Sequence, residues 1–288
     1  MTCKFCITKP VVNLSNNNIK LCKVCFIRYY EKKVLKTIRN YDLLDDCKRM
    51  GVAVSGGKNS LIILNILNNL IKQRISKNIG LIAVHIDEKI KGFSEKNNKI
   101  LKDFCSKNNI QLKIYPIKNS IKTESPYAFY GSLIRSLLNK KSRELKIERL
   151  ATGHNLDSEA QSIMMNQLKN NIERSSRLGI IIDSKDNRFI PRVKPLYFVM
   201  DSESVLYAKL NNIKNVKNVY KDSFRDKVAN MLNEMELKYP GTKYNIINSF
   251  LEILPSLKKK YKTKIKECKI CSEPCSQEVC NTCRLIKK

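Results

Sequence analysis

One stretch of this sequence, Ser55-Gly56-Gly57-Lys58-Asn59-Ser60, has residue types and spacing that suit phosphate binding. The apolar run before it, Val52–Val54, predicts a buried strand, and the apolar periodicity of residues 61–67 predicts a helix after it. Two glycines at such a turn let backbone N–H groups approach an anion, and the helix dipole favours negative charge there. An ordinary strand–helix turn is the alternative, but the Ser-Gly-Gly-Lys-x-Ser spacing favours a phosphate site.

Eight of the eleven cysteines form two groups near the ends of the chain, and each group contains two Cys-x-x-Cys pairs. Fifteen residues separate the pairs of the first group, and eight separate those of the second. Four thiolates at such spacings suit a tetrahedral metal site, so we predict one structural zinc ion per group rather than disulfides. The predicted ligands are Cys3, Cys6, Cys22, Cys25, Cys268, Cys271, Cys280 and Cys283.

Alternating strands and helices must position the phosphate-binding stretch. Strands are predicted at 52–54, 81–86, 112–117 and 149–152, and helices at 59–72, 95–107, 129–145 and 156–169. This alternation predicts an α/β fold with a parallel sheet flanked by helices, whose ligands bind at the carboxyl ends of the strands. Farther along, we expect a proline-stiffened loop at 190–196 and helices at 202–210, 222–237 and 244–254.

Three further side chains lie at predicted strand ends on the ligand side of the sheet. His85 and His154 are the only histidines, and a lone histidine is more often structural than functional. Their shared position at the ligand side favours a role near the nucleotide. Asp157 lies at the start of a predicted helix, where it is either a helix cap or a carboxylate that holds Mg²⁺ against a phosphate.

The net charge of +29, from 55 basic and 26 acidic residues, indicates a polyanionic partner. Codon bias in an AT-rich genome accounts for some of the lysines, but the excess favours RNA or DNA binding. Residues 26–47 form a basic amphipathic helix that is either a packed linker or a surface for RNA phosphates, and residues 258–266 form a basic run that is either a phosphate contact or a solvated linker. No apolar run reaches 18 residues and no signal peptide is evident, so we expect no membrane span and a cytoplasmic location.

Several stretches carry a resemblance to known proteins. Residues 54–60, Val-Ser-Gly-Gly-Lys-Asn-Ser, resemble the PP-loop of ATP pyrophosphatases. Residues 150–162, Leu-Ala-Thr-Gly-His-Asn-Leu-Asp-Ser-Glu-Ala-Gln-Ser, are similar to the ATGHNLDDEAQ stretch of the TtuA-type tRNA 2-thiolation proteins. Residues 224–245 and the two flanking cysteine groups also match that family. The resemblance covers nearly the whole chain and implies a PP-loop, HUP-like sheet with an N- and a C-terminal zinc ribbon.

This resemblance implies a tRNA-modifying enzyme that adenylates the 2-oxygen of a uridine and replaces it with sulfur. Its cofactors are ATP, Mg²⁺ and two Zn²⁺, and Asp157 and Lys58 are the implied catalytic residues. Family members commonly take sulfur from a ubiquitin-like carrier and are often homodimers. The implied nucleotide contacts are Ala53, Val54, Ser55, Gly56, Gly57, Lys58, Ser60, His85, Arg135, Gly153 and His154.

The chain departs from this family at several positions. Asn59 replaces an aspartate but keeps an oxygen able to cap the helix, Ser158 replaces an acid, and Ile134 replaces a basic residue. Tyr127, Tyr130 and Asn218 stand where the family has three core cysteines, so we do not expect an iron–sulfur cluster. Three functions stay open: thiolation with sulfur delivered directly to the adenylate, a paralogue that binds tRNA and ATP without thiolating, and adenylation of another substrate.

These assignments divide the chain into five parts. The expected order is an N-terminal zinc ribbon at 1–27, a linker helix at 28–48, the PP-loop ATP-binding domain at 49–215, a helical region at 216–262 and a C-terminal zinc ribbon at 263–288.

Overall fold

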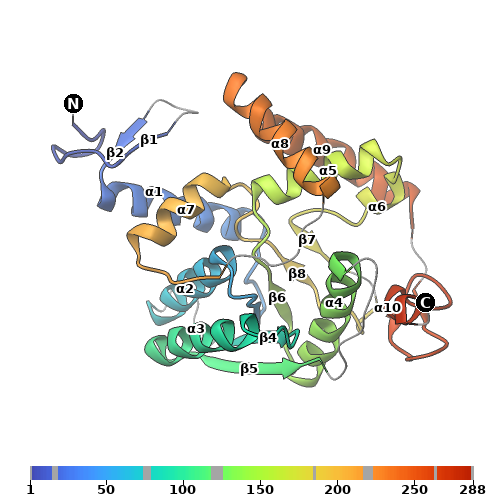
Figure 1. Cartoon of the computed structure of the whole chain (residues 1–288). Coiled ribbons are helices and arrows are strands. Elements are labelled where there is room, and N and C mark those ends of the chain that lie inside the picture. Colours follow the sequence, from blue (N-terminus) through green and yellow to red (C-terminus); the bar gives the residue numbers. More distant parts are fainter. Residues whose placement is uncertain are drawn as a thin grey trace.

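A central sheet organises the computed structural model, which describes residues 2–14, 19–73, 79–117, 126–183, 186–216, 223–262 and 265–286 (Figure 1). Its strand order is β5-β4-β3-β6-β8-β7, and every neighbouring pair is parallel except β7 and β8. The strands are β3 (Arg49–Ala53), β4 (Gly80–Asp87), β5 (Gln111–Pro116), β6 (Arg149–Ala151), β7 (Ile181–Ile182) and β8 (Arg192–Val193). The predicted α/β fold with a parallel sheet is confirmed.

Helices cover both faces of the sheet because its strands bury alternate side chains in opposite directions. Ala83 of β4 packs into the main core with α2 (Lys58–Lys72) and α3 (Phe93–Asn108), whereas its neighbours Ile82 and Val84 face a second cluster with α4 (Pro126–Glu144). The strand order reverses between β3 and β6, which are adjacent in the sheet. The sheet continues from β3 to β4 and β5 on one side, and from β6 to β8 and β7 on the other. Their carboxyl ends therefore form the crevice where such sheets bind ligands.

The N-terminal hairpin leads into a helix that is packed on the core. The hairpin consists of β1 (Val12–Leu14) and β2 (Ile19–Leu21), and α1 (Lys23–Asn40) follows it. On its inner side, α1 contacts α7 (Asp201–Leu210), where the Tyr30 and Tyr207 rings stack with centroids 4.3 Å apart and the Tyr30 hydroxyl lies 2.9 Å from Ser204 Oγ. The inner side of α1 is therefore packed against α7.

The C-terminal third adds a helical layer and a second small ribbon (Figure 1). Helices α8 (Ser223–Lys238) and α9 (Thr242–Lys260) pack on α5 (Leu156–Leu168), and the short α6 (Ile172–Ser175) contacts both α5 and α9. The ribbon contains β9 (Lys266–Glu267), β10 (Pro274–Cys275) and α10 (Asn281–Ile286). It sits against α4, where Arg143 Nη2 lies 2.8 Å from Glu273 Oε1.

The structure differs from the sequence prediction at the edge of the sheet, where the two short strands β7 and β8 were not predicted. Residues 190–196 were expected to form a loop, yet Arg192 and Val193 are β8, paired with β6 and β7. A two-residue strand between prolines has no period-2 pattern, so its pairing is fixed by the neighbouring strands. No helix in the described part of the chain is long and apolar enough to cross a membrane.

A buried ion pair fixes the end of β8 to α5, and we predict that breaking it on one side is costly. Lys194 Nζ lies 2.7 Å from Glu159 Oε2, and both side chains are almost wholly buried. Lys194→Met leaves the Glu159 carboxylate buried without its cation, so the free energy of unfolding should fall by about 3–5 kcal/mol in urea titrations. The double variant Lys194→Met/Glu159→Leu should recover most of that loss. A single variant as stable as the wild type contradicts this prediction.

Candidate nucleotide site and metal centres

The turn between β3 and α2 has a backbone that only glycine suits at its centre. Gly56 has a φ of +80°, and a Cβ added there would lie 1.7 Å from Asn97 Oδ1 of α3. The Asn97 amide also donates to the Ser55 carbonyl oxygen over 3.0 Å, so the side chain of α3 holds the turn from outside. Both the left-handed φ and the close packing therefore require the missing side chain.

Ser60 stabilises the turn from inside. Its hydroxyl donates to the Gly57 carbonyl (2.9 Å) and accepts from the Ser55 N–H (3.3 Å), and the side chain is buried. The backbone N–H groups of residues 58–60 belong to the first turn of α2, where α-helices have no internal acceptors. The loop thus presents backbone donors at a helix N-terminus, an arrangement that binds anions.

The end of β6 lies directly against this first turn. A Cβ added to Gly153 would be 3.0 Å from Ser60 N and 3.2 Å from the carbonyl carbon of Asn59. Gly153 therefore lies close to the first turn of α2 across the strand-order reversal. The structure brings Gly153, as well as Val54 and Ser60, to the same crevice.

His85 is held in one tautomer beside the loop. Its ring is buried, and its Nδ1 lies 2.7 Å from the Val54 carbonyl oxygen, which can only accept a hydrogen bond. Nδ1 therefore carries the proton. Burial lowers the pKa of His85, so the ring is neutral at physiological pH and leaves Nε2 as an acceptor.

Positive charge surrounds His154, whose side chain is exposed. Desolvation and the charges of Lys194, Arg192 and Arg135 lower the pKa of His154, so this ring is also neutral. Its Nδ1 lies 2.9 Å from Thr152 Oγ1. Arg135 lies on α4, and its Nη1 would be 3.4 Å from a Cβ added to Gly131. Arg192 Nη2 lies 3.4 Å from the Arg135 carbonyl oxygen.

A chain of charged side chains links the loop to three other helices. Lys58 Nζ lies 2.8 Å from Asp201 Oδ1, which also accepts from the Asn155 amide (2.9 Å). The Asp201 N–H donates to Asp157 Oδ2 over 2.7 Å, and the other Asp157 oxygen pairs with Lys243 Nζ. Asp201 and Lys243 were not predicted as site residues, although Asp201 is an acid in the first turn of a predicted helix and Lys243 lies in the stretch 224–245 that resembles the family.

Two predicted helix caps are wrong. Asn155 caps α5, because its Oδ1 accepts from the Ser158 N–H (3.0 Å) while Ser158 Oγ accepts from the Asn155 N–H (2.9 Å). Asp157 instead faces α7 and α9. At the start of α2 the cap position is Gly57 and no side chain caps the helix, so Asn59 does not do so.

The residues around the loop fit a metal-bound triphosphate. Backbone donors and Lys58 suit phosphate oxygens, and Asn59 Oδ1 is a buried oxygen without a hydrogen-bond partner among the described residues. An amide oxygen of this kind is a suitable ligand for Mg²⁺, which prefers oxygen donors and phosphate.

Both predicted cysteine groups come together in space. In each group the four Sγ atoms lie within 4.8 Å of one another, and adjacent pairs such as Cys6–Cys22 (3.5 Å) and Cys271–Cys280 (3.8 Å) approach the spacing of ligands around one tetrahedral ion. Burial acts against ionisation, but hydrogen bonds from backbone N–H groups lower the pKa of Cys3 and of Cys268 to about 6, while burial and the neighbouring thiols raise the pKa of Cys25 and of Cys283. The close approach of four sulfur atoms, rather than the ionisation of any one of them, is what suits a metal ion.

A solved relative corrects the expectation about iron–sulfur clusters. The structure of the U34-tRNA thiolase NcsA from Methanococcus maripaludis, described with its 4Fe–4S cluster, matches all of this chain and 96% of its own with a TM-score of 0.84 and 31% identity. The expectation that this chain has no such cluster is therefore wrong. That expectation rested only on the three positions where the family has core cysteines. Tyr130 lies on α4, whereas Asn218 and the Tyr127 side chain lie outside the described residues. Thiolates are the ligands of iron–sulfur clusters, and the chain has two groups of four.

Comparison with known proteins agrees with this geometry. The PP-loop domain family matches residues 28–226. The tRNA-5-methyluridine(54) 2-sulfurtransferase of Pyrococcus horikoshii is 34% identical over 99% of this chain and 93% of its own length. The tRNA 2-thiolation protein NcsA of Haloferax volcanii is 26% identical over 100% of this chain and 98% of its own. The chain belongs to the PP-loop family, among the tRNA 2-thiolation proteins.

Proposed function

We propose that this protein is an ATP-dependent tRNA uridine 2-sulfurtransferase. ATP binds at the loop of residues 54–60, a tRNA uridine is adenylated at its 2-oxygen with release of pyrophosphate, and sulfur then displaces AMP. The observation that carries the proposal is the contact of Gly153 with the first turn of α2, which builds an anion site at the strand-order reversal. The 2-thiolation activities named for its relatives support the choice of substrate.

Each side chain near the loop has a proposed task. The N–H groups of residues 58–60 bind the phosphates, and Lys58, held by Asp201, stabilises the charge of the departing pyrophosphate. We propose that Ala53, Val54 and the neutral His85 contact the nucleoside, and that Arg135 and His154, which are close enough to interact electrostatically, also contact the nucleotide.

Asp157 keeps its proposed role as the carboxylate for Mg²⁺, which when bound neutralises charge on the phosphates. Its oxygens contact Lys243 and the Asp201 N–H. Binding of the ion at Asp157 therefore requires that Lys243 gives up its place. Asn59 Oδ1 is the second proposed oxygen at this position.

The identity of the uridine, the sulfur donor and the assembly are further parts of the proposal. The names of two relatives specify different tRNA positions, U54 and U34, and we propose that the target is one of these two uridines. We propose a ubiquitin-like thiocarboxylate protein as donor, a homodimer as assembly and the cytoplasm as location.

Product analysis tests the reaction directly. Purified protein incubated with ATP, Mg²⁺ and unmodified tRNA should release pyrophosphate only when tRNA is present, and tRNA from a deletion strain should lack one 2-thiouridine in nucleoside mass spectrometry. Unchanged 2-thiouridine contradicts the proposal. Pyrophosphate release without 2-thiouridine, even with a sulfur donor, points to adenylation of another group, and binding without turnover points to a non-thiolating paralogue.

Removing the cation of the loop should impair the activation step more than binding. Lys58→Met is expected to lower kcat for pyrophosphate release by about 10²–10³-fold, and Asp201→Asn by less, because Lys58 stays but loses its partner. The matched control is Lys141→Met, which removes a lysine from the surface pair with Glu144 on α4 and should leave kcat unchanged. Equal effects of the Lys58 and Lys141 variants contradict the assigned role.

Metal analysis tests the two cysteine groups separately. Cys6→Ser and Cys271→Ser should each remove the metal of one group and leave the other, because each loses one of four thiolate ligands. Zinc, iron and acid-labile sulfide are measured together, and visible absorption shows whether a cluster is present. Cys105→Ser, which changes a buried cysteine outside both groups, is the control. Metal content unaffected by either ligand variant contradicts the assignment.

A further inference from the structure

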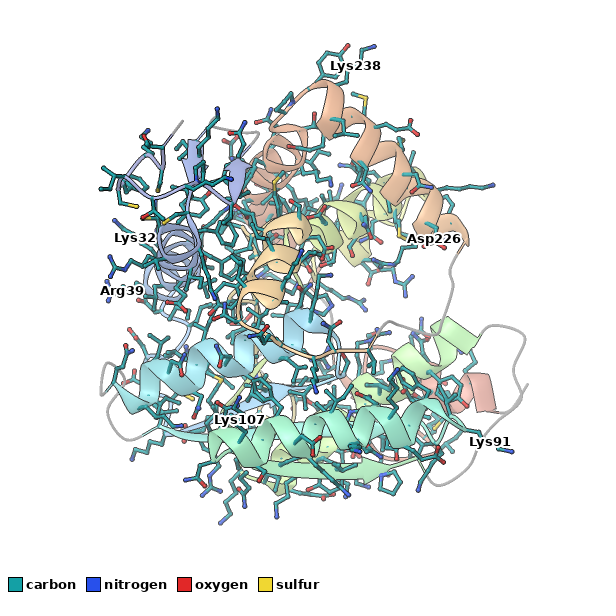
Figure 2. All side chains as sticks on the ribbon, turned by 60° about the vertical axis from the view of Figure 1, so that its left-hand side comes forward. Lys32, Arg39, Lys91, Lys107, Asp226 and Lys238 are labelled. Atoms are coloured by element: carbon teal, nitrogen blue, oxygen red, sulfur yellow. The ribbon has the colours of Figure 1, made fainter. Side chains whose placement is uncertain are left out.

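The outer side of α1 carries a row of positive charges that the nucleotide site does not use. Arg28, Lys32, Lys36 and Arg39 are all exposed. Steps of four, four and three residues place them on one face of the helix, over about 16 Å of its length. Figure 2 shows Lys32 and Arg39 on the outer side of α1, pointing away from the rest of the chain.

These four cations form no salt bridge with another residue in the described ranges. Glu31 is the one acidic residue of α1, and its carboxylate accepts from the Tyr207 hydroxyl over 2.7 Å on the inner side. Lys33, also on the inner side, is paired with Glu203 at 2.8 Å. The helix thus separates its paired charges, which face α7, from its unpaired cations, which face solvent.

A lysine-rich composition alone does not explain this row. On α3, exposed Lys96 and Lys102 are interspersed with exposed Glu95 and Asp103. In contrast, no acidic residue occurs among the first 30 residues of the chain, although the whole chain contains 26. Residues 1–40, which form the N-terminal ribbon and α1, thus contain nine basic residues and one acidic residue.

The ribbon continues the basic face and adds apolar side chains. Lys4 and Lys9 are exposed on either side of a tight loop that the Cys3 N–H closes by donating to the Thr8 carbonyl (3.0 Å). On this loop Phe5 is 64% and Ile7 is 92% exposed. An exposed aromatic ring among cations suits an unpaired base, which stacks on the ring while its phosphates meet the cations.

We propose that the outer row of α1 and the Phe5 loop together form the docking face for tRNA. The row binds backbone phosphates, and Phe5 stacks on a base in an unpaired loop. This proposal deepens the proposed function, since it takes the tRNA substrate as its partner. The inner side of α1 contacts α7, and α7 begins at Asp201, the partner of Lys58. A tRNA on this face is thus connected to the PP-loop through one helix.

Salt-dependent binding of fluorescently labelled tRNA tests the row. Lys32→Gln/Lys36→Gln should weaken binding about tenfold at moderate salt and reduce the slope of log K against log salt by about 1–2, since each phosphate contact contributes roughly 0.7–0.9. The control is Lys102→Gln/Lys107→Gln, which removes the same charge from α3 and should leave the slope unchanged (Figure 2). ATP affinity should be the same in both double variants.

A second arm tests the ring. Phe5→Ala should weaken binding of tRNA about five- to hundredfold with little change in slope, while Phe5→Trp should retain affinity. Neither variant should alter binding of a fully paired duplex RNA, which offers no base for stacking. Metal content is measured for each variant to show that the ribbon is intact.

The outcomes separate this proposal from the proposed function. If the wild-type protein binds tRNA through this face but releases no pyrophosphate, the docking face is supported and the enzymatic proposal is overturned. Equal loss of slope in the α1 and α3 variants, absence of tRNA binding by the wild type, or tighter binding to vesicles of anionic lipid than to tRNA overturns the docking face.

Discussion

The nucleotide crevice depends on a close approach of two backbones at the carboxyl ends of β3 and β6. Gly153 lies so near the first turn of α2 that a methyl group would be 3.0 Å from Ser60 N, and Gly56 lies against Asn97 from the opposite side. Backbone atoms have little freedom to yield, unlike the ends of long side chains. The absence of a side chain at Gly153 therefore allows the end of β6 to approach the first turn of α2, and its absence at Gly56 allows α3 to approach the turn.

The charged side chains extend this local constraint to the outer helices. Lys58 contacts Asp201 at the start of α7, the Asp201 N–H contacts Asp157 of α5, and Asp157 pairs with Lys243 at the start of α9. Most of these charged side chains are at least partly buried. Removing one partner of a buried pair destabilises a protein by more than the intact pair stabilises it. These contacts connect α5, α7 and α9 to Lys58 at the start of α2.

Periodicity was sufficient to predict the central fold, because β3, β4 and β5 contain apolar runs and are separated by helices with regular apolar spacing. The predicted range 81–86 lies within β4 (Gly80–Asp87), and the predicted helix 59–72 nearly coincides with α2. β8 escaped detection because two residues between prolines carry no periodic signal. The same limit applies to the site: the PP-loop is local in sequence, whereas the pairs Lys58–Asp201 and Asp157–Lys243 join residues 143 and 86 positions apart.

The amino-acid composition, with a net charge of +29, predicts a polyanionic partner but not the surface that binds it. The structure divides α1 into an inner side, whose Tyr30 and Lys33 contact α7, and an outer side with exposed cations. The inner contacts pack α7, which begins with the acid that holds Lys58, against the helix whose outer side is the proposed docking face. On that proposal, α7 connects the helix that docks tRNA to the loop that is proposed to bind ATP.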